Sequence, residues 1–240
     1  MTDLLNIAAQ FALSSAPSSY RECSEGHING TYFIYCERGE RYVLQRINTS
    51  VFKDPDGLMK NIIGVTEHIS KKIEAAGGDV KRGTLHFIPT KDGSVYYRDE
   101  NGGCWRSYEY VRNVVGYQSA ESPKVFESVG RAFGKFQMQL ADYDVTNLSE
   151  TIPDFHNTPA RYNAFLEALE ADKAGRAASV AEEIAWIESR RERMLEFWAL
   201  VEQQVLPMRV THNDTKLNNV MFDITTGKAI CVVDLDTVMP

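Results

Sequence analysis

The sequence lacks several features that mark specialised classes of protein. Its four cysteines form no C-x-x-C pair and no cluster with histidine, which gives little support to a zinc site or a disulfide framework. No apolar run approaches the roughly 18 residues of a membrane span. Basic residues number 26 against 33 acidic ones, so the surplus that nucleic acid or anionic lipid would require is missing. We therefore expect a cytoplasmic protein with reduced thiols that binds neither nucleic acid nor a membrane.

The composition that remains is that of an ordinary globular protein. The 240 residues are 43% hydrophobic and 25% charged, enough for one large domain or two small lobes. The N-terminal segment has no basic region and carries Asp3, while apolar residues from Leu4 to Ala12 recur at helical spacing. This spacing predicts a short amphipathic helix rather than a signal peptide.

Up to about residue 112 the sequence is typical of strands and turns. β-rich runs flank the turn residues Glu37–Glu40, Asp92-Gly93 and Asn101–Gly103, which predicts an antiparallel sheet. The segment DPDGLMKNIIGVTEHISKKIEAAGG interrupts these runs with apolar residues near a 3.6-residue period. It predicts one helix, ending at Gly77-Gly78.

From residue 122 onward the pattern is mostly helical. Ser122 and Pro123 form an N-cap and first-turn pair, and a second helix is expected near Pro159. Ser179 and Glu182 fit a capping box, which predicts the start of a third helix of about six turns. After Pro207 the sequence returns to strands.

Polar residues gather near the end of the sequence. Two predicted strands, Val220–Phe222 and Ala229–Val233, form a hairpin, and Asp214 and Asn219 lie on the loop before it. Asp234 ends the second strand, so all three side chains are expected at one end of the hairpin. A carboxylate and an amide oxygen suit Mg²⁺, and a second carboxylate could accept a hydroxyl proton. These are the groups that phosphoryl transfer requires.

The same residues carry a family resemblance. The pattern H-x-D-x-x-x-x-N followed by a strand-ending Asp, here HNDTKLNN and VVDLD, resembles the catalytic loop and metal motif of the protein-kinase-like fold. Asn213 replaces the Arg of eukaryotic protein kinases, so the sequence is closer to the aminoglycoside phosphotransferase and choline kinase superfamily. GHINGTYFI, RYVLQRIN, LMKNIIGVTEHI and CWRSYEYV precede these motifs in an order and spacing similar to bacterial N-acetylhexosamine 1-kinases.

The resemblance implies a bilobal, protein-kinase-like α+β fold. Residues 1–112 would form an N-terminal nucleotide-binding lobe, with an antiparallel sheet and one helix. Residues 113–240 would form a mainly helical C-terminal lobe with a catalytic β-hairpin. The implied reaction uses ATP and Mg²⁺ to phosphorylate a small-molecule hydroxyl, expected to be the anomeric hydroxyl of an N-acetylhexosamine; choline, ethanolamine or homoserine is the alternative acceptor.

The resemblance also predicts a C-terminally short chain, because family members normally continue well past the metal-binding Asp. The alternative to an active kinase is therefore a truncated nucleotide-binding or interaction module without turnover. Uncovered apolar helix faces would then favour self-association.

Roles of individual residues follow from the resemblance. Asp214 matches the catalytic base, and Asn219 and Asp234 match the Mg²⁺ ligands. Asp236 would either help a second metal ion or hold the loop. His212 is expected to be structural.

In the first lobe the turn EGHINGTY matches the segment that covers the nucleotide phosphates. Gly26, Asn29 and Gly30 are the candidate phosphate-binding residues, since a glycine lets backbone N–H groups approach closely. His27 is either a contact to the sugar or an exposed turn residue.

The strand YVLQRIN should supply a cation for the phosphates, and Arg46 is the candidate because the strand contains no Lys. A register shift of one residue would instead turn Gln45 toward the nucleotide. Glu67 and Glu74 are both available as the acidic partner on the helix. Residues near SYEYVRN are expected to receive the adenine, and Arg106 and its aromatic neighbours are assigned either to this region or to sheet packing.

Overall fold

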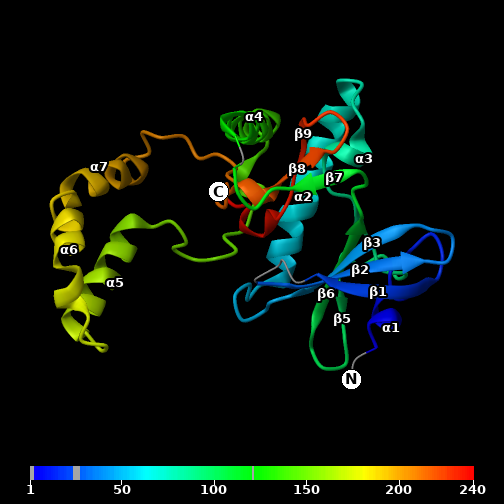
Figure 1. Ribbon diagram of the computed structural model, residues 1–240, viewed down its shortest axis with the longest axis horizontal. Coiled ribbons are helices and arrows are strands. Elements are labelled where there is room, and N and C mark those ends of the chain that lie inside the picture. The colour runs from blue at the N-terminus through cyan, green and yellow to red at the C-terminus, as the bar shows by residue number, and fades with distance from the viewer. Residues whose placement is uncertain (1–2, 24–27, 121) are drawn as a thin grey trace. The chain divides into compact units, whose positions relative to one another are not determined.

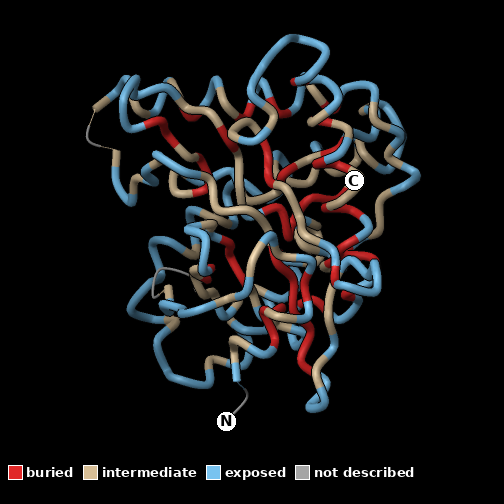
Figure 2. The backbone as a smooth tube through the Cα atoms, turned by 90° about the vertical axis from the view of Figure 1, so that its right-hand side faces the viewer, coloured by how far each residue is buried: buried red, intermediate tan, exposed pale blue. Residues whose placement is uncertain are grey.

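The structure, a computed structural model, describes residues 3–23, 28–120 and 122–240. Antiparallel strands and helices make up the chain (Figure 1), which confirms the predicted α+β class. Buried stretches, red in Figure 2, alternate with exposed turns and loops. Among the described helices, none has the length and apolarity that crossing a membrane would require.

The chain divides into two compact units. The first joins Met1–Thr151 to Val210–Pro240, and the second is Ile152–Arg209. The first unit therefore contains both sheets, together with the HNDTKLNN and VVDLD motifs. The lobe boundary predicted between residues 112 and 113 falls between these two sheets and stays a prediction.

The larger sheet is antiparallel, with the strand order β1-β2-β3-β6-β4 and with β5 also paired to β6. Its strands are β1 (Pro17–Cys23), β2 (Gly30–Cys36), β3 (Arg41–Ile47), β4 (Phe87–Ile88), β5 (Tyr97–Arg98) and β6 (Cys104–Glu109). In the register of β3 and β6, Gln45 lies opposite Arg106 and Arg46 lies opposite Trp105. Because side chains alternate along a strand, these two pairs lie on opposite faces of the sheet.

One face of this sheet is covered by the N-terminal segment. Helix α1 (Leu4–Ala8) begins at Asp3, whose carboxylate accepts a hydrogen bond from the Leu5 N–H. Its buried residues pack with Leu44 and Trp105 of the sheet. The predicted helix extended to Ala12, but the chain leaves the helical path after Ala8 because the Ala12 N–H bonds to the Pro89 carbonyl instead.

Helix α2 (Pro55–Ala75) follows β3 and confirms the predicted helix. The Asp54 carboxylate accepts the Gly57 N–H at 3.0 Å, which caps the first turn. The chain turns away at Gly77, whose φ of 67° is in the left-handed region that favours glycine. A short helix, α3 (Val80–Gly83), comes next.

The second sheet holds the predicted hairpin. Strands β8 (Val220–Asp223) and β9 (Ala229–Val232) pair with each other, and β7 (Val114–Gly116) pairs with β8. Helix α4 (Pro123–Gln139), which begins at the predicted Ser122-Pro123 pair, packs on this sheet. Their shared core is Val129, Phe133, Val220 and Phe222. Short 3₁₀ turns complete the unit: η1 (Val145–Asn147), η3 (Leu217–Asn219) and η4 (Leu235–Thr237).

The second unit is helical. It contains α5 (Thr158–Ala171), η2 (Ala177–Val180), α6 (Ala181–Glu188) and α7 (Arg191–Glu202). The helix predicted near Pro159 is confirmed as α5, with Asn157 as its cap.

The single long helix predicted from Ser179 is wrong in two respects. Val180, not Ser179, caps α6, because the Ser179 hydroxyl donates back to the Arg176 carbonyl. The helix also breaks between α6 and α7. There the Ser189 hydroxyl donates to the Trp186 carbonyl at 2.8 Å, and such side-chain bonds compete with the helical backbone pattern.

Candidate active site

The segment that we call the HND loop, residues 212–219, is anchored at both ends to the chain that follows β9. Before the loop, the Thr211 N–H bonds to the Met239 carbonyl at 3.1 Å. At its end, the Asn219 carbonyl accepts the Val233 N–H at 2.9 Å. These two backbone bonds hold the loop beside Asp234 and Asp236.

His212 lies behind the loop and is almost fully buried between Phe133 and Phe136. Its Nε2 lies 2.9 Å from the Val233 carbonyl, which requires a proton on Nε2, and its Nδ1 accepts the Asp214 N–H at 3.3 Å. Burial lowers the pKa of His212. The neutral ring therefore orients the backbone of the loop, in keeping with the structural role that we expected.

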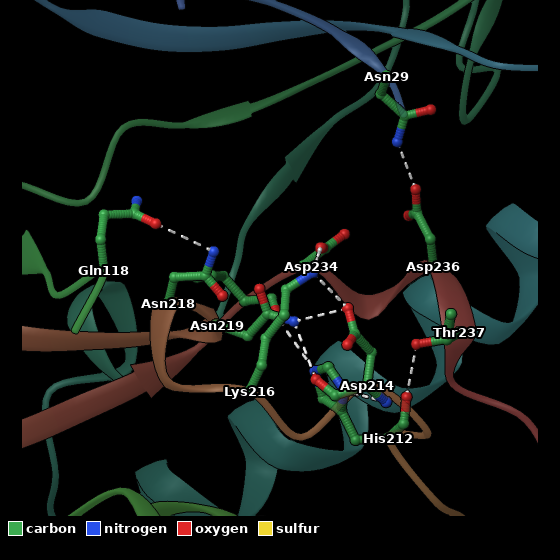
Figure 3. A network of polar contacts seen from close by, with 11 residues as sticks. Asn29, Gln118, His212, Asp214, Lys216, Asn218, Asn219, Asp234, Asp236 and Thr237 are labelled. Carbon is green, nitrogen blue, oxygen red and sulfur yellow. Dashed lines mark hydrogen bonds and ion pairs between the residues drawn. The ribbon is translucent and has the colours of Figure 1, made fainter. Parts of the chain in front are cut away.

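Asp214 has two polar neighbours on its Oδ2 atom (Figure 3). Lys216 Nζ lies 2.7 Å away, and Asn219 Nδ2 donates from 3.0 Å and also bonds to the Asp214 carbonyl. Burial opposes the charge of Lys216, but the hydrogen bond and charge of Asp214 outweigh it, and the pKa of Lys216 is raised. The carboxylate of Asp214 is thus fixed in orientation by an amide and an ammonium group.

Asp234 follows β9 with φ 59° and ψ 58°, a left-handed conformation that few non-glycine residues adopt. Its Oδ2 lies 3.7 Å from Lys216 Nζ. Burial and the negative charge of Asp236 raise the pKa of Asp234, so a nearby cation would stabilise its ionised form.

These side chains fit a magnesium ion. The Asn219 amide uses its Nδ2 on Asp214, which leaves its Oδ1 as an oxygen ligand, and Asn219 and Asp234 line the same cavity. Within the described residues there is no cluster of three or more His, Cys, Asp or Glu side chains that could hold a metal. Mg²⁺ suits such a sparse site because it binds through one or two carboxylates and completes its shell with water and phosphate oxygens.

Asp236 has a different environment from Asp234. It is buried, its Oδ1 lies 2.5 Å from Arg106 Nη1, and its Oδ2 accepts a hydrogen bond from Asn29 Nδ2 at 2.5 Å. Figure 3 shows Asn29 reaching this carboxylate from the large sheet. Both oxygens have protein partners, so of the two expected roles the geometry favours holding the loop over binding a second metal ion.

The phosphate-covering turn is described only in part. Gly26 and His27 lie outside the described residues. Asn29 accepts the Asn48 N–H at 2.9 Å through Oδ1 while it donates to Asp236. Gly30 opens β2, and a Cβ atom there would make only ordinary contacts, 3.6 Å from Arg46 and Tyr32. Close approach therefore does not require glycine at this position, and the phosphate role of Gly30 stays a prediction.

On β3 the side chain that faces the site is Gln45. Its Oε1 accepts hydrogen bonds from Arg106 and its Nε2 donates to Thr31. Arg46 is exposed on the other face, with its guanidinium 5.8 Å from the centre of the Trp105 ring. The structure thus places the candidate cation Arg46 away from the site, as in the register that we gave as the alternative.

Neither candidate acid on α2 reaches β3. Glu67 and Glu74 are both exposed, while Ile62 of the same helix faces the site. The acidic partner in this region is Asp236, which comes from η4 rather than from the helix.

A cavity of about 270 Å³ lies between the large sheet and the hairpin. Gln45, Arg106 and Asn29 line it from the sheet side, and Asn219 and Asp234 line it from the hairpin side. In the described part of the chain its charged lining residues are Arg106, Lys216, Asp234 and Asp236. The cavity therefore brings the predicted metal ligands together with two cations.

Residues 19–240 match the phosphotransferase enzyme family, APH. The chain belongs to this family. The match includes all the candidate residues named above and both sheets of the first unit, apart from the first two residues of β1.

Solved structures of other phosphotransferases share the fold. An amicoumacin kinase in complex with AMP-PNP, Ca²⁺ and Ami has a TM-score of 0.59 at 16% identity, covering 98% of this chain and 64% of the other. An aminoglycoside phosphotransferase from Alicyclobacillus acidocaldarius has 0.58 at 14%, covering 98% and 66%. Spectinomycin phosphotransferase APH(9)-Ia, in complex with ADP and spectinomycin, has a TM-score of 0.55 at 13% identity, covering 98% of this chain and 68% of the other. The chain thus spans about two thirds of the length of these proteins, and its kinase-like fold is established.

Two charged residues of the cavity lining, Lys216 and Arg106, have no role among the residue assignments made from the sequence. Lys216 stands two positions after Asp214, and this spacing within the HND loop was the available signal. Arg106 was treated as part of the adenine region or of sheet packing. The signal that could have identified it is a charged residue between Trp105 and Ser107 on a strand that is otherwise buried.

Proposed function

We propose that this phosphotransferase is an ATP- and Mg²⁺-dependent kinase of a small-molecule hydroxyl in cytoplasmic carbohydrate metabolism. Its proposed acceptor is the anomeric hydroxyl of an N-acetylhexosamine. The observation that carries the kinase assignment is the arrangement of Asp214 beside Lys216 and Asn219, with Asp234 next to them on the cavity wall.

In the proposed reaction, Asp214 orients the acceptor hydroxyl and takes up its proton. Lys216 and Asn219 both contact Oδ2, so we assign Oδ1 to the hydroxyl. The hydroxyl oxygen forms a bond to the γ-phosphorus, the bond from that phosphorus to the β,γ-bridging oxygen breaks, and ADP leaves with that electron pair. Lys216 lies between two carboxylates and is positioned to neutralise charge on the transferred group.

Nucleotide and metal binding are supported by two kinds of observation. Proteins of the same fold were crystallised with ADP or with AMP-PNP and Ca²⁺. In this chain Asn219 and Asp234 can supply oxygen ligands, and because the pKa of Asp234 is raised, a further cation would stabilise its ionised form. When bound, Mg²⁺ would neutralise phosphate charge at this end of the hairpin.

The acceptor is proposed from the sequence motifs alone. The order of GHINGTYFI, RYVLQRIN and THNDTKLNNVMFD supports an N-acetylhexosamine, and His27 of the first motif is the proposed sugar contact. Choline, ethanolamine and homoserine remain the alternative acceptors, because a fold does not determine the substrate.

The test is an ADP-release assay of the purified chain with ATP and Mg²⁺. The acceptors are N-acetylglucosamine, N-acetylgalactosamine, choline, ethanolamine and homoserine. We expect turnover with a sugar only, and a fall in kcat of about 10²- to 10⁴-fold in Asp214→Asn, the range that general-base groups contribute. Nucleotide affinity should be unchanged. Asp79→Asn, at an exposed position outside the cavity lining, is the matched control.

Other outcomes would change the assignment. Turnover with choline or homoserine would replace the sugar as acceptor. Full turnover in Asp214→Asn would contradict the assignment of the base. Nucleotide binding without turnover on any acceptor would identify a nucleotide-binding module, and no nucleotide binding would reject the proposed function.

A further inference from the structure

We propose that Arg106 is the residue on the sheet side of the cavity that binds the nucleotide phosphates, with Gln45 and Asp236 as its positioning residues. This inference rests on the proposed function, since it assumes that a nucleoside di- or triphosphate enters the cavity. It assigns the cation to β6, the strand next to the one in which it was predicted.

Gln45 fixes one side of the guanidinium. The two residues are directly opposite in the register of β3 and β6. Gln45 Oε1 accepts from Arg106 Nε at 3.0 Å and from Nη2 at 2.8 Å. The Gln45 amide is itself held, because Nε2 donates to Thr31 at 3.1 Å. A neutral side chain thus occupies the expected cation position and orients a cation on the neighbouring strand.

Asp236 fixes the other side. Its Oδ1 lies 2.5 Å from Arg106 Nη1, and both side chains are 3% exposed. Burial works against the charge of Arg106, but Asp236 outweighs it and keeps the pKa above the ordinary value. A buried ion pair is a poor source of stability compared with apolar packing of the same volume. Its presence on a cavity wall therefore favours a binding role.

The guanidinium has a donor left for a ligand. It carries five N–H groups, and the contacts with Gln45 and Asp236 use three of them. Of the remaining two, the one on Nη1 is buried beside Asp236, and the one on Nη2 is left to donate to a phosphate oxygen. Lys216 is the other cation of the cavity lining in the described residues, and it is held by Asp214 and Asp234 on the hairpin side. Arg106 is therefore the cation that lines the cavity on the sheet side in the described residues.

The test compares ADP with adenosine by isothermal titration calorimetry. Removing a phosphate contact should weaken ADP and leave adenosine unchanged, whereas a merely structural defect would weaken both. Arg106→Gln alone would leave the buried Asp236 carboxylate without its cation. The main variant is therefore Arg106→Gln/Asp236→Asn, and it is compared with Asp236→Asn. Titrations with Mg²⁺ and with EDTA separate the guanidinium from any effect of Asp236 on metal binding.

We expect the double variant to bind ADP about 10- to 100-fold more weakly than Asp236→Asn, with and without Mg²⁺, the range for a charged hydrogen bond. Adenosine affinity should be equal in both. Adding Gln45→Lys should restore part of the ADP affinity, since it returns a cation to the facing position. Arg21→Gln, on β1 beside Phe33, is the control for loss of an arginine.

Three results would overturn the inference. Equal ADP affinity in Asp236→Asn and the double variant would remove the phosphate role of Arg106. Parallel losses for ADP and adenosine would assign Arg106 to structure. A loss of ADP affinity in Arg46→Gln, with the double variant unaffected, would assign phosphate binding to Arg46 on β3. In these cases the wild-type protein still binds ADP, whereas a wild-type protein that binds neither ligand contradicts the proposed function itself.

Discussion

His212 combines burial with two hydrogen bonds that only a neutral ring with its proton on Nε2 can make. Nε2 donates to the Val233 carbonyl, and Nδ1 accepts from the Asp214 backbone. A second proton would remove the acceptor and place a charge between Phe133 and Phe136. The folded state therefore resists protonation of this residue more than the unfolded chain does, and the pKa is lowered on folding.

We predict that His212 makes the protein less stable in mild acid. Above about pH 6.5, the unfolded pKa, its contribution is fully present. As the pH falls below that value, the unfolded chain binds a proton that the folded state excludes. The free energy of unfolding should then fall with a slope approaching about 1.4 kcal/mol per pH unit until the folded pKa is reached. Urea unfolding from pH 7.5 to 5 measures the slope.

His212→Asn provides the comparison for this prediction. It should lower stability at pH 7.5 but remove the extra slope between pH 6.5 and 5. His156→Asn, at an exposed histidine of the second unit, is the matched control and should retain that extra slope. If the wild type and His212→Asn have parallel profiles, the slope belongs to other groups.

At the residue scale, sequence patterns predicted the contacts between site residues that are close together in the sequence. Asp214 and Asn219 are five residues apart on one loop, and the hairpin brings Asp234 beside them. The side chains that Arg106 contacts are 61 residues before it and 130 residues after it, and no periodicity records such a contact. Asp234 and Asp236 also look equivalent in VVDLD, although the Asp234 side chain is 44% exposed at the cavity and the Asp236 side chain is 3% exposed with two partners.

At the element scale, a buried amide links helix α2 to two later segments of the chain. Asn61 is fully buried. Its Nδ2 donates to the Ser149 carbonyl at 2.7 Å and the Val238 carbonyl at 2.9 Å, and its Oδ1 accepts the Ser149 N–H at 2.8 Å. The Asn61 side chain thus joins α2 to the segment after α4, at Ser149, and to the segment after the hairpin, at Val238.

We predict that Asn61→Ala lowers the free energy of unfolding by about 2–4 kcal/mol, because it leaves buried backbone groups without partners. Urea denaturation gives the value, and Lys60→Ala on the exposed face of the same helix is the control. A loss below about 1 kcal/mol, the scale of a single ordinary hydrogen bond, would mean that the segments rearrange to satisfy these groups.

Elements were predictable where their ends carry local signals. Asp54 caps the start of α2, Pro55 occupies its first turn, and Gly77 takes the left-handed conformation after its end. Each effect involves only residues that are close in the sequence. The break between α6 and α7 was missed because apolar spacing continues through it. The Ser189 hydroxyl bonds to the Trp186 carbonyl at the break, but Ser128 makes a similar bond inside the unbroken helix α4, so a serine in the sequence does not mark the end of a helix.

For the molecule as a whole, the connection between the two sheets of the first unit includes Arg82. Its Nη2 lies 2.7 Å from Asp223 Oδ2 and also donates to the carbonyls of Arg112 and Asn113. Asp223 is mostly buried, and hydrogen bonds from the Thr226 backbone together with Arg82 lower its pKa to about 2. Arg82 therefore links the segment after α2 to the hairpin turn and to the chain between the sheets.

We predict a coupling free energy of about 0.5–2 kcal/mol between Arg82 and Asp223 in a double-mutant cycle of Arg82→Gln and Asp223→Asn. The pair is partly buried, so the value should exceed that of an exposed pair. Lys81→Gln, at the exposed neighbouring position, should show no coupling to Asp223→Asn. Additive effects of the two changes in urea unfolding would contradict the link.

The bond from Asn61 to Val238 joins residues 177 positions apart. During synthesis, α2 emerges long before its partner carbonyl exists, and the HND loop must likewise wait for Met239 to pair with Thr211. The large sheet can form early on the ribosome, but the amide of Asn61 stays hydrated until Val238 has been made. Chaperones would therefore meet this protein with its large sheet formed and its HND loop not yet anchored.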